Sequence, residues 1–124
     1  MAKIMVVDDD PMIRNLVRML LEEKGYEVME SENGLDCLEK LIEGERPDLI
    51  LLDVMMPKMD GWEVSRRIKT NEVLKDIPIC MLTAKTTTMD ALMSLESAHA
   101  DWHLNKPISK NILIQTVEWI LSGK

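Results

Sequence analysis

The stretch DLILLD, residues 48–53, decides the fold of this chain, because four consecutive apolar residues stand between two aspartates. A strand with one buried face alternates apolar and polar residues, whereas an unbroken apolar run is typical of a strand buried on both faces of a parallel sheet. Helices cover both faces of such a sheet. The stretch therefore predicts an α/β domain in which residues 48–53 form a central strand.

Further strand-like runs lie on both sides of this stretch in the chain, and segments with helical periodicity separate them. The last run is short and more polar, which favours a place at the edge of the sheet. This alternation predicts a doubly wound, five-stranded parallel sheet. The predicted strands are residues 3–7, 26–30, 48–53, 77–82 and 102–104.

Local signals mark where the predicted helices begin and end. Asp10 is placed to cap the first helix, Pro11 suits its first turn, and Gly25 suits its stop; Ser109 is placed to cap the last helix. Trp62 and Trp119 are predicted to be helix packing residues. The predicted helices are residues 11 to the Gly25 stop, 33–43, 62–70, about 87–98, and a last helix after Ser109. The residues expected to face inward are Leu35, Leu38, Leu41 and Ile42 in the second helix and Leu113, Val117, Ile120 and Leu121 in the last.

Composition narrows the class of protein. The 124 residues suit one domain, 46% of them are hydrophobic, and the net charge is −7. No basic stripe is present, so direct nucleic-acid binding is disfavoured. Cys37 and Cys80 form no CxxC motif and are expected to be buried, reduced thiols. No apolar run is long enough to cross a membrane or serve as a signal peptide, so we expect a cytoplasmic protein.

Polar residues follow four of the predicted strands. Asp8 and Asp9 in VVDDDP (residues 6–11) follow the first strand, Asp53 ends the third, Thr83 follows the fourth and Lys106 follows the fifth. Ligands of doubly wound sheets bind outside the carboxyl ends of the strands. We therefore expect these side chains to lie together at one edge of the sheet.

Several carboxylates at one edge are costly without a cation, and a hard divalent ion would relieve that cost. Mg²⁺ prefers oxygen ligands and often uses one or two carboxylates. Asp9 and Asp53 are the candidate ligands, with Asp8 behind them through water and the backbone carbonyl of Met55 as a further ligand. No His/Cys cluster accompanies them, which disfavours zinc.

The same edge carries the parts of a phosphate site. Lys106 can neutralise a phosphoryl oxygen, and the Thr83 hydroxyl can donate to another. Asp53 can act as a nucleophile, since carboxylates form aspartyl phosphates. Such a transfer depends mainly on positioning and charge neutralisation.

Four motifs at successive strand ends carry a family resemblance: VVDDDP (6–11), LLDVMMPKMDG (51–61), MLTA (81–84) and NKP (105–107). In this order and spacing they closely resemble the receiver domain of two-component response regulators. The resemblance covers nearly the whole chain and implies a single receiver domain over residues 1–124, with a flavodoxin-like (βα)5 fold and strand order 2-1-3-4-5. It also implies a pocket-shaping loop at Pro57, Asp60 and Gly61, and a cis bond before Pro107.

The resemblance further implies a role for each residue at the edge. Asp53 matches the residue that accepts a phosphoryl group from a phosphohistidine of a sensor kinase, and Asp8 and Asp9 match the acidic pair for Mg²⁺. Thr83 matches the switch hydroxyl, and Lys106 matches the lysine that contacts the phosphoryl group.

Two positions near the fifth strand depart from the family pattern. His103 stands where the family usually has Tyr or Phe, so either the switch is altered, weak or pH-sensitive, or His103 is a partly exposed strand histidine with no special role. Trp102 stands where a polar residue is usual. It either adds an apolar anchor to a face used for partners or dimers, or packs in the core.

The resulting hypothesis is a receiver that acts as a phosphorylation-controlled switch for protein interactions. It catalyses its own Mg²⁺-dependent phosphorylation and dephosphorylation without being a metabolic enzyme. The expected partners are a sensor histidine kinase or phosphotransfer protein and a downstream output protein, with a monomer or a phosphorylation-dependent dimer as the active form. The chain ends one residue past Gly123, so no DNA-binding output domain is expected unless the sequence is a fragment.

Two alternatives remain open from the sequence. One is a pseudo-receiver, a binding module that works without phosphorylation, which the altered position at His103 favours. The other is a Mg²⁺-dependent phosphohydrolase that passes through an aspartyl phosphate. Such an enzyme usually needs a cap over the substrate, and no insertion here could form one.

Overall fold

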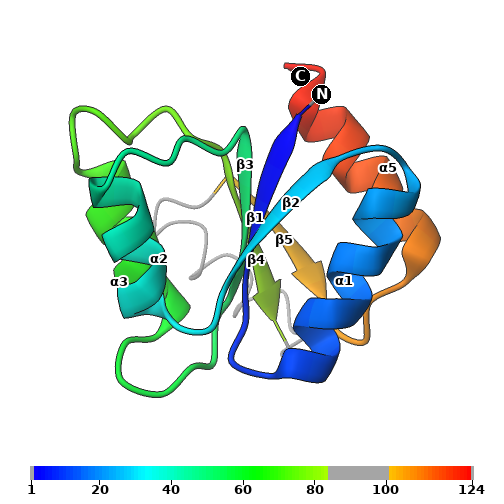
Figure 1. Ribbon diagram of the computed structural model, residues 1–124, viewed down its shortest axis with the longest axis horizontal. Coiled ribbons are helices and arrows are strands. Elements are labelled where there is room, and N and C mark those ends of the chain that lie inside the picture. The colour runs from blue at the N-terminus through cyan, green and yellow to red at the C-terminus, as the bar shows by residue number, and fades with distance from the viewer. Residues whose placement is uncertain (1, 84–100, 124) are drawn as a thin grey trace.

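The computed structural model describes residues 2–83 and 101–123. Five parallel strands form one sheet in the order β2-β1-β3-β4-β5, which confirms the predicted topology (Figure 1). The strands are β1 (Lys3–Val7), β2 (Glu27–Ser31), β3 (Leu49–Asp53), β4 (Ile79–Thr83) and β5 (Trp102–Asn105). The helices described are α1 (Pro11–Glu23), α2 (Gly34–Ile42), α3 (Gly61–Lys69) and α5 (Lys110–Leu121).

The central strand is β3, and all five of its residues are buried. Alternate residues of the strands point to opposite faces of the sheet and enter two separate apolar clusters. Ile50 and Leu52 pack on the side of α2 and α3, whereas Leu49 and Leu51 pack on the side of α1 and α5. Burial on both faces thus explains the unbroken apolar run of the sequence, and Figure 1 shows the helices that lie on the two sides of the sheet.

Strand ends differ from the predicted ones by one or two residues. β4 begins at Ile79 instead of residue 77, because Pro78 has no N–H to donate to a neighbouring strand, although its carbonyl accepts from Ile50 N at 3.0 Å. β2 extends to Ser31, which pairs with Val7. β5 lies at the sheet edge, as predicted.

Each described helix begins at a side-chain cap. Asp10 Oδ1 accepts from Met12 N at 2.9 Å at the start of α1, and Pro11 occupies its first position, as predicted. Asn33 caps α2, Asp60 caps α3, and Ser109 caps α5. Gly25, after α1, has a φ of +91°, which few other residues tolerate. These ends are local features, and for this reason the sequence predicts them well.

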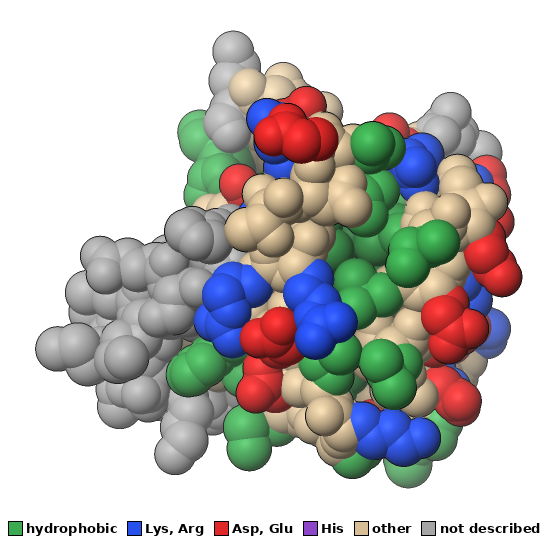
Figure 2. All heavy atoms as spheres, turned by 90° about the vertical axis from the view of Figure 1, so that its left-hand side faces the viewer, with side chains coloured by type: hydrophobic (Ala, Val, Ile, Leu, Met, Phe, Trp, Pro, Cys, Tyr) green, Lys and Arg blue, Asp and Glu red, His purple; other side chains and the backbone are tan. Residues whose placement is uncertain are grey.

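The prediction that Leu35 and Ile42 face inward is wrong. Leu35 is 42% exposed and Ile42 is 79% exposed, whereas Cys37 and Leu41 of the same helix are buried. Figure 2 faces the side of α2 and α3 and shows hydrophobic side chains gathered at the surface between charged ones. A helix buries only the face that packs against its neighbours, and α2 carries apolar residues outside this face as well.

Tryptophans lie on both sides of the sheet. Trp62 packs against the cluster under α2 and α3, as predicted for a helix packing residue. Trp119 of α5 is 53% exposed, and its ring meets that of Trp102 edge-on, with centroids 6.3 Å apart and planes at 86°. Trp102 is half-buried and packs against the cluster under α1 and α5.

Three further sequence observations complete the fold. Cys37 and Cys80 are buried free thiols, as predicted. Within residues 2–83 and 101–123, every helix is too short or too polar to cross a membrane. The helix predicted at about residues 87–98 lies outside the described residues.

Candidate functional site: an acidic cluster at the carboxyl edge of the sheet

The carboxyl ends of the parallel strands bring the predicted site residues to one edge of the sheet. Asp8 directly follows β1, Asp53 is the last residue of β3, Thr83 is the last residue of β4, and Lys106 directly follows β5. β3 lies between β1 and β4, so Asp53 stands in the middle of this row. The expectation from the strand ends is therefore confirmed for the position of these residues.

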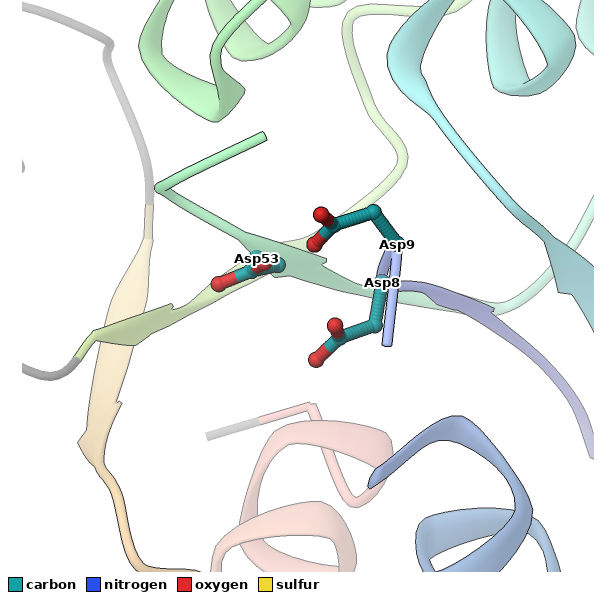
Figure 3. Close-up of side chains that lie close together, drawn as sticks. All are labelled: Asp8, Asp9 and Asp53. Atoms are coloured by element: carbon teal, nitrogen blue, oxygen red, sulfur yellow. The ribbon is translucent and has the colours of Figure 1, made fainter. Parts of the chain in front are cut away.

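Three carboxylates converge at the ends of β1 and β3 (Figure 3). Each of Asp8, Asp9 and Asp53 offers an oxygen within 4.8 Å of the oxygens offered by the other two. Asp8 is fully buried and Asp53 is 3% exposed, while Asp9 is open to solvent. Two of the three negative charges therefore have little access to water.

Lys106 supplies a cation to the two buried carboxylates. Its Nζ lies 3.0 Å from Asp53 Oδ1 and 3.1 Å from Asp8 Oδ2. Burial by itself lowers the pKa of Lys106, but its hydrogen bonds and opposite charges from Asp53 and Asp8 prevail and raise this pKa. The ammonium group is thus charged near neutral pH and bridges the two strand ends.

One ammonium group does not balance three carboxylates, and the pKa of Asp53 reflects this. Burial and, to a smaller extent, the nearby charge of Asp8 raise this pKa, whereas Lys106 lowers it, and together these effects raise the pKa of Asp53 to about 6. Asp53 is therefore ionised near neutral pH but at an energetic cost. A second cation among the three carboxylates would remove that cost.

The carboxylates form an oxygen-only donor set, and two of them are fixed by surrounding contacts. Hard oxygen donors of this kind suit Mg²⁺ better than zinc, which prefers nitrogen and sulfur ligands. The three oxygens lie close enough to share one ion. The residues present therefore fit a Mg²⁺ site.

Asp8 is held at four of its atoms. Its Oδ1 accepts from Asp10 N at 2.9 Å, its Oδ2 accepts from Lys106, and its backbone carbonyl accepts from Arg14 Nη1 at 2.7 Å. Its own N–H donates to Ser31 O at 3.2 Å. The position of the first carboxylate is thus set by α1 and β2 as well as by β1.

Sequence reasoning did not include Arg14 among the site residues. Helix periodicity directs attention to the apolar residues of α1, and Arg14 reads there as one of its solvated charges. The available signal was its spacing, since Arg14 is four residues after the cap residue Asp10 and so lies one turn above the β1–α1 loop. Its partner Glu30 on β2 could be identified only from the fold.

A tight loop follows Asp53. Gly61 N donates to Val54 O at 2.9 Å, and a Cβ at Gly61 would lie 2.3 Å from the carbonyl oxygen of Asp53, so only glycine fits. The side chain of Met55 is 69% exposed, and a ligand role for its carbonyl stays a prediction. The Lys106–Pro107 bond is cis, as the resemblance implies.

Thr83 ends β4 at the same edge, whereas His103 lies two residues before the end of β5, where it pairs with Met81. Thr83 is 7% exposed, and its carbonyl accepts from Lys106 N at 2.8 Å. His103 is half-buried on β5 and lines a cavity of about 380 Å³ together with Asn105 and Pro107. Trp102 faces the α5 side, so His103, the next residue, faces the other side of the sheet. Their roles as switch and interaction residues stay predictions.

Comparison with known proteins gives consistent matches. A family model described as the response regulator receiver domain matches residues 4–118. The alkaline phosphatase synthesis transcriptional regulatory protein PhoP of Bacillus subtilis is 42% identical over 119 residues, which are 96% of this chain and 48% of that protein. Protein PilH of Pseudomonas aeruginosa is 31% identical over 123 residues, which are 99% of this chain and 100% of that protein.

Solved structures agree with these matches. The chemotaxis response regulator CheY4 of Vibrio cholerae has a TM-score of 0.89 and 33% identity, with 97% of this chain and 98% of that chain covered. A putative response regulator of Chloroflexus aurantiacus has a TM-score of 0.91 and 30% identity, with 98% of each chain covered. The chain spans about half the length of the transcriptional regulators it matches and the whole length of PilH.

Proposed function

Because this chain belongs to the family of response regulator receiver domains, we propose that Asp53 accepts a phosphoryl group from a phosphohistidine of a sensor histidine kinase or phosphotransfer protein. One observation carries the proposal: a nearly buried carboxylate ends the central strand, with a lysine ammonium 3.0 Å from one of its oxygens and two further carboxylates beside it. Carboxylates in such surroundings act as nucleophiles toward phosphorus.

The transfer forms one bond and breaks one bond. A carboxylate oxygen of Asp53 attacks the phosphorus atom, and the bond from phosphorus to the donor's imidazole nitrogen or acyl oxygen breaks with its electron pair leaving on the donor. The Nζ of Lys106 lies 3.0 Å from Asp53 Oδ1 and would stabilise the negative charge of the incoming phosphoryl oxygens. Thr83, buried at the end of β4, supplies a hydroxyl at the same edge.

Asp8, Asp9 and Asp53 would hold Mg²⁺, together with the backbone carbonyl of Met55. Bound Mg²⁺ supplies positive charge that neutralises the carboxylates and the phosphoryl oxygens. The ionised state of Asp53 needed for attack is costly in its buried position, as its pKa of about 6 reflects. Bound Mg²⁺ would lower this cost and thereby favour the attacking form of Asp53.

Phosphorylation would act as a switch between two populations of the protein. Thr83 and Lys106 are joined through their backbones by the 2.8 Å hydrogen bond, so a shift toward the phosphoryl group moves the ends of β4 and β5 together. His103 and Trp102 lie on β5 and would carry the change to the surface. The half-exposed ring of Trp119 beside Trp102 enlarges the apolar area there.

The proposed setting follows from this activity. The protein would receive its phosphoryl group in the cytoplasm and pass its signal to a downstream output protein, as a monomer or as a phosphorylation-dependent dimer. We propose no direct nucleic-acid contact, given the net charge of −7. The whole chain would act as one receiver domain.

Intact-protein mass spectrometry after incubation with acetyl phosphate tests the proposal. We expect one added phosphoryl group in the presence of Mg²⁺ and none without it. Asp53→Asn should abolish the adduct. Asp76→Asn is the matched control, because Asp76 is exposed and lies before the start of β4, away from the edge that carries Asp53, so this variant should be phosphorylated like the wild type.

Other outcomes would point to the alternatives. No adduct, together with no binding of beryllofluoride as a stable phosphoryl mimic, would favour a pseudo-receiver that binds partners without phosphorylation. Fast hydrolysis of small phosphate esters would favour a phosphohydrolase. An adduct that persists in Asp53→Asn would contradict the assignment of the nucleophile.

A further inference from the structure

We propose that Arg14 is a positioning residue of the acidic site, which joins the backbone carbonyl of Asp8 to Glu30 and thereby sets the affinity for Mg²⁺. This inference rests on the proposed function, and in particular on Mg²⁺ binding by Asp9 and Asp53. Arg14 touches none of the reacting groups directly, so it would act through the position of the β1–α1 loop.

The guanidinium group of Arg14 connects two elements. Its Nη1 donates to Asp8 O at 2.7 Å, and its Nε donates to Glu30 Oε1 at 2.9 Å. The side chain is 18% exposed, and that of Glu30 is 30% exposed, so water screens these contacts only in part. Glu30 belongs to β2, and thus Arg14 ties the loop after β1 to the neighbouring strand.

The carbonyl of Asp8 is a sensitive place to hold the loop. The peptide unit that contains Asp8 O also contains the N atom of Asp9, and this unit is planar. A fixed carbonyl therefore fixes the plane from which the Asp9 side chain projects. Asp9 is the exposed member of the three carboxylates, so its direction depends on this plane more than on packing.

The charge of Arg14 and its hydrogen bonds make opposite predictions for Mg²⁺ affinity. A guanidinium group repels a metal cation nearby, so removal of the charge alone would strengthen Mg²⁺ binding. Loss of the hydrogen bond to Asp8 would let the loop move and weaken binding. The sign of the change therefore separates a positioning role from a simple electrostatic one.

Arg18 offers a matched control on the same helix. Its Nη1 donates to the other oxygen of Glu30, Oε2, at 2.9 Å, one turn after Arg14. Within the described part of the chain, no hydrogen bond or ion pair joins Arg18 to Asp8. Replacing Arg18 thus removes an equal charge and a contact with the same glutamate, but leaves the carbonyl of Asp8 held.

Isothermal titration calorimetry with Mg²⁺ alone tests the inference on four full-length proteins: wild type, Arg14→Met, Arg14→Lys and Arg18→Met. We expect Arg14→Met to weaken Mg²⁺ binding by roughly 10-fold or more, as is typical when a group that orients a ligand is lost. Arg14→Lys keeps the charge but cannot span both acceptors, so it should also weaken binding. Arg18→Met should bind like the wild type.

A second readout uses the phosphorylation of Asp53 by acetyl phosphate. The Mg²⁺ concentration for half-maximal rate should rise in Arg14→Met, while the rate at saturating Mg²⁺ should approach that of the wild type. A thermal melt of each protein shows whether it is folded. If Arg14→Met does not fold, Arg14→Lys carries the test.

Each remaining outcome has one meaning. A wild-type protein with no saturable Mg²⁺ binding would overturn the Mg²⁺ site and this inference together. Unchanged or tighter binding in both Arg14 variants, with normal binding in the wild type, would overturn only the inference. Equal weakening in Arg18→Met would also overturn it, because the effect would then come from Glu30 or from helix stability.

Discussion

The segments that follow β1 and β5, at the carboxyl edge of the sheet, hold their charged groups in different ways. After β1, Asp8 is fixed by the backbone of Asp10, by Arg14 and by its own N–H bond to Ser31. After β5, the ammonium group of Lys106 is bound, within the described residues, only by the carboxylates of Asp8 and Asp53. Asp8 is therefore held by the loop, α1 and β2, whereas the ammonium group is held by the carboxylates of Asp8 and Asp53.

This difference suits a site that binds and releases charged groups, such as a cation or a phosphoryl group. A carboxylate cluster that is fixed in advance loses little entropy when it binds a cation. An ammonium group on a flexible side chain can follow a new negative charge. Substitutions in the two segments should accordingly affect stability and metal binding in different proportions.

Removal of the Lys106 ammonium should have the largest effect on stability. Lys106→Met leaves two buried carboxylates close together without their cation, which costs on the order of 3 kcal/mol in the free energy of unfolding. Urea unfolding of the metal-free protein near neutral pH would measure this loss, and added Mg²⁺ should restore much of it.

Lys110→Met is the control for this prediction. Lys110 pairs with Glu23, but both side chains are about half exposed, so water already screens the pair. Little change in the unfolding free energy is expected. Equal losses in the Lys106 and Lys110 variants would mean that the carboxylates at the sheet edge do not depend on their cation.

Asp53→Asn should have the opposite effect and make the metal-free protein more stable. The folded pKa of about 6 exceeds the ordinary value of 3.8, so the folded state binds the proton more tightly than the unfolded state. The ionised Asp53 carboxylate therefore destabilises the folded state. This destabilisation is absent at low pH, where Asp53 is protonated in both states, and it grows as the pH rises from about 3.8 through about 6. The difference between 3.8 and about 6 corresponds to at most roughly 3 kcal/mol near neutral pH.

Unfolding curves across the acid range would check this pH dependence. The increase in unfolding free energy that Asp53→Asn produces should become smaller as the pH falls toward 4. Asp76→Asn is the control, and its unfolding free energy near neutral pH should stay close to that of the wild type, because Asp76 is exposed and lies before β4, away from the acidic cluster. If Asp53→Asn is less stable than the wild type near neutral pH, the attraction between Lys106 and the ionised Asp53 carboxylate outweighs the cost of burying that carboxylate.

The smallest change in stability is expected for substitutions at Asp10. These substitutions should change the unfolding free energy without changing the affinity for Mg²⁺. Asp10→Ala removes the cap of α1 and should lower the unfolding free energy by about 1 kcal/mol. The backbone N–H of residue 10 would still donate to Asp8 Oδ1, so the Mg²⁺ affinity should stay close to that of the wild type. Asp10→Ser keeps a cap and should recover most of the stability. A large loss of Mg²⁺ affinity in Asp10→Ala would contradict this separation.

The features that the sequence predicted correctly are mostly local or periodic. The apolar run of β3 requires burial on both faces, and the residues after the strands must then meet at one edge. Caps such as Asp10 and Ser109 act within one helical turn and can be recognised without knowledge of the fold. The carboxylate cluster and its lysine were therefore accessible to prediction.

The errors and omissions have a different origin. Leu35 and Ile42 have the spacing of buried residues, but α2 has no neighbour on that part of its surface within the described chain. Arg14 resembles a solvated helix residue until β2 places Glu30 beside it. Trp102 could face either side of the sheet from its sequence alone, because the period of a strand is two and does not say which face is outside.

By itself, the sequence determined the type of sheet, the ends of most helices and the edge at which Asp8, Asp53, Thr83 and Lys106 meet, because these follow from periodicity and from the parallel direction of the strands. The tertiary structure alone decided how the charges at that edge are held. The bridge of Lys106 to two carboxylates and the link from Asp8 through Arg14 to Glu30 join segments far apart in the chain. Such contacts depend on strand register and helix rotation, which no local pattern specifies.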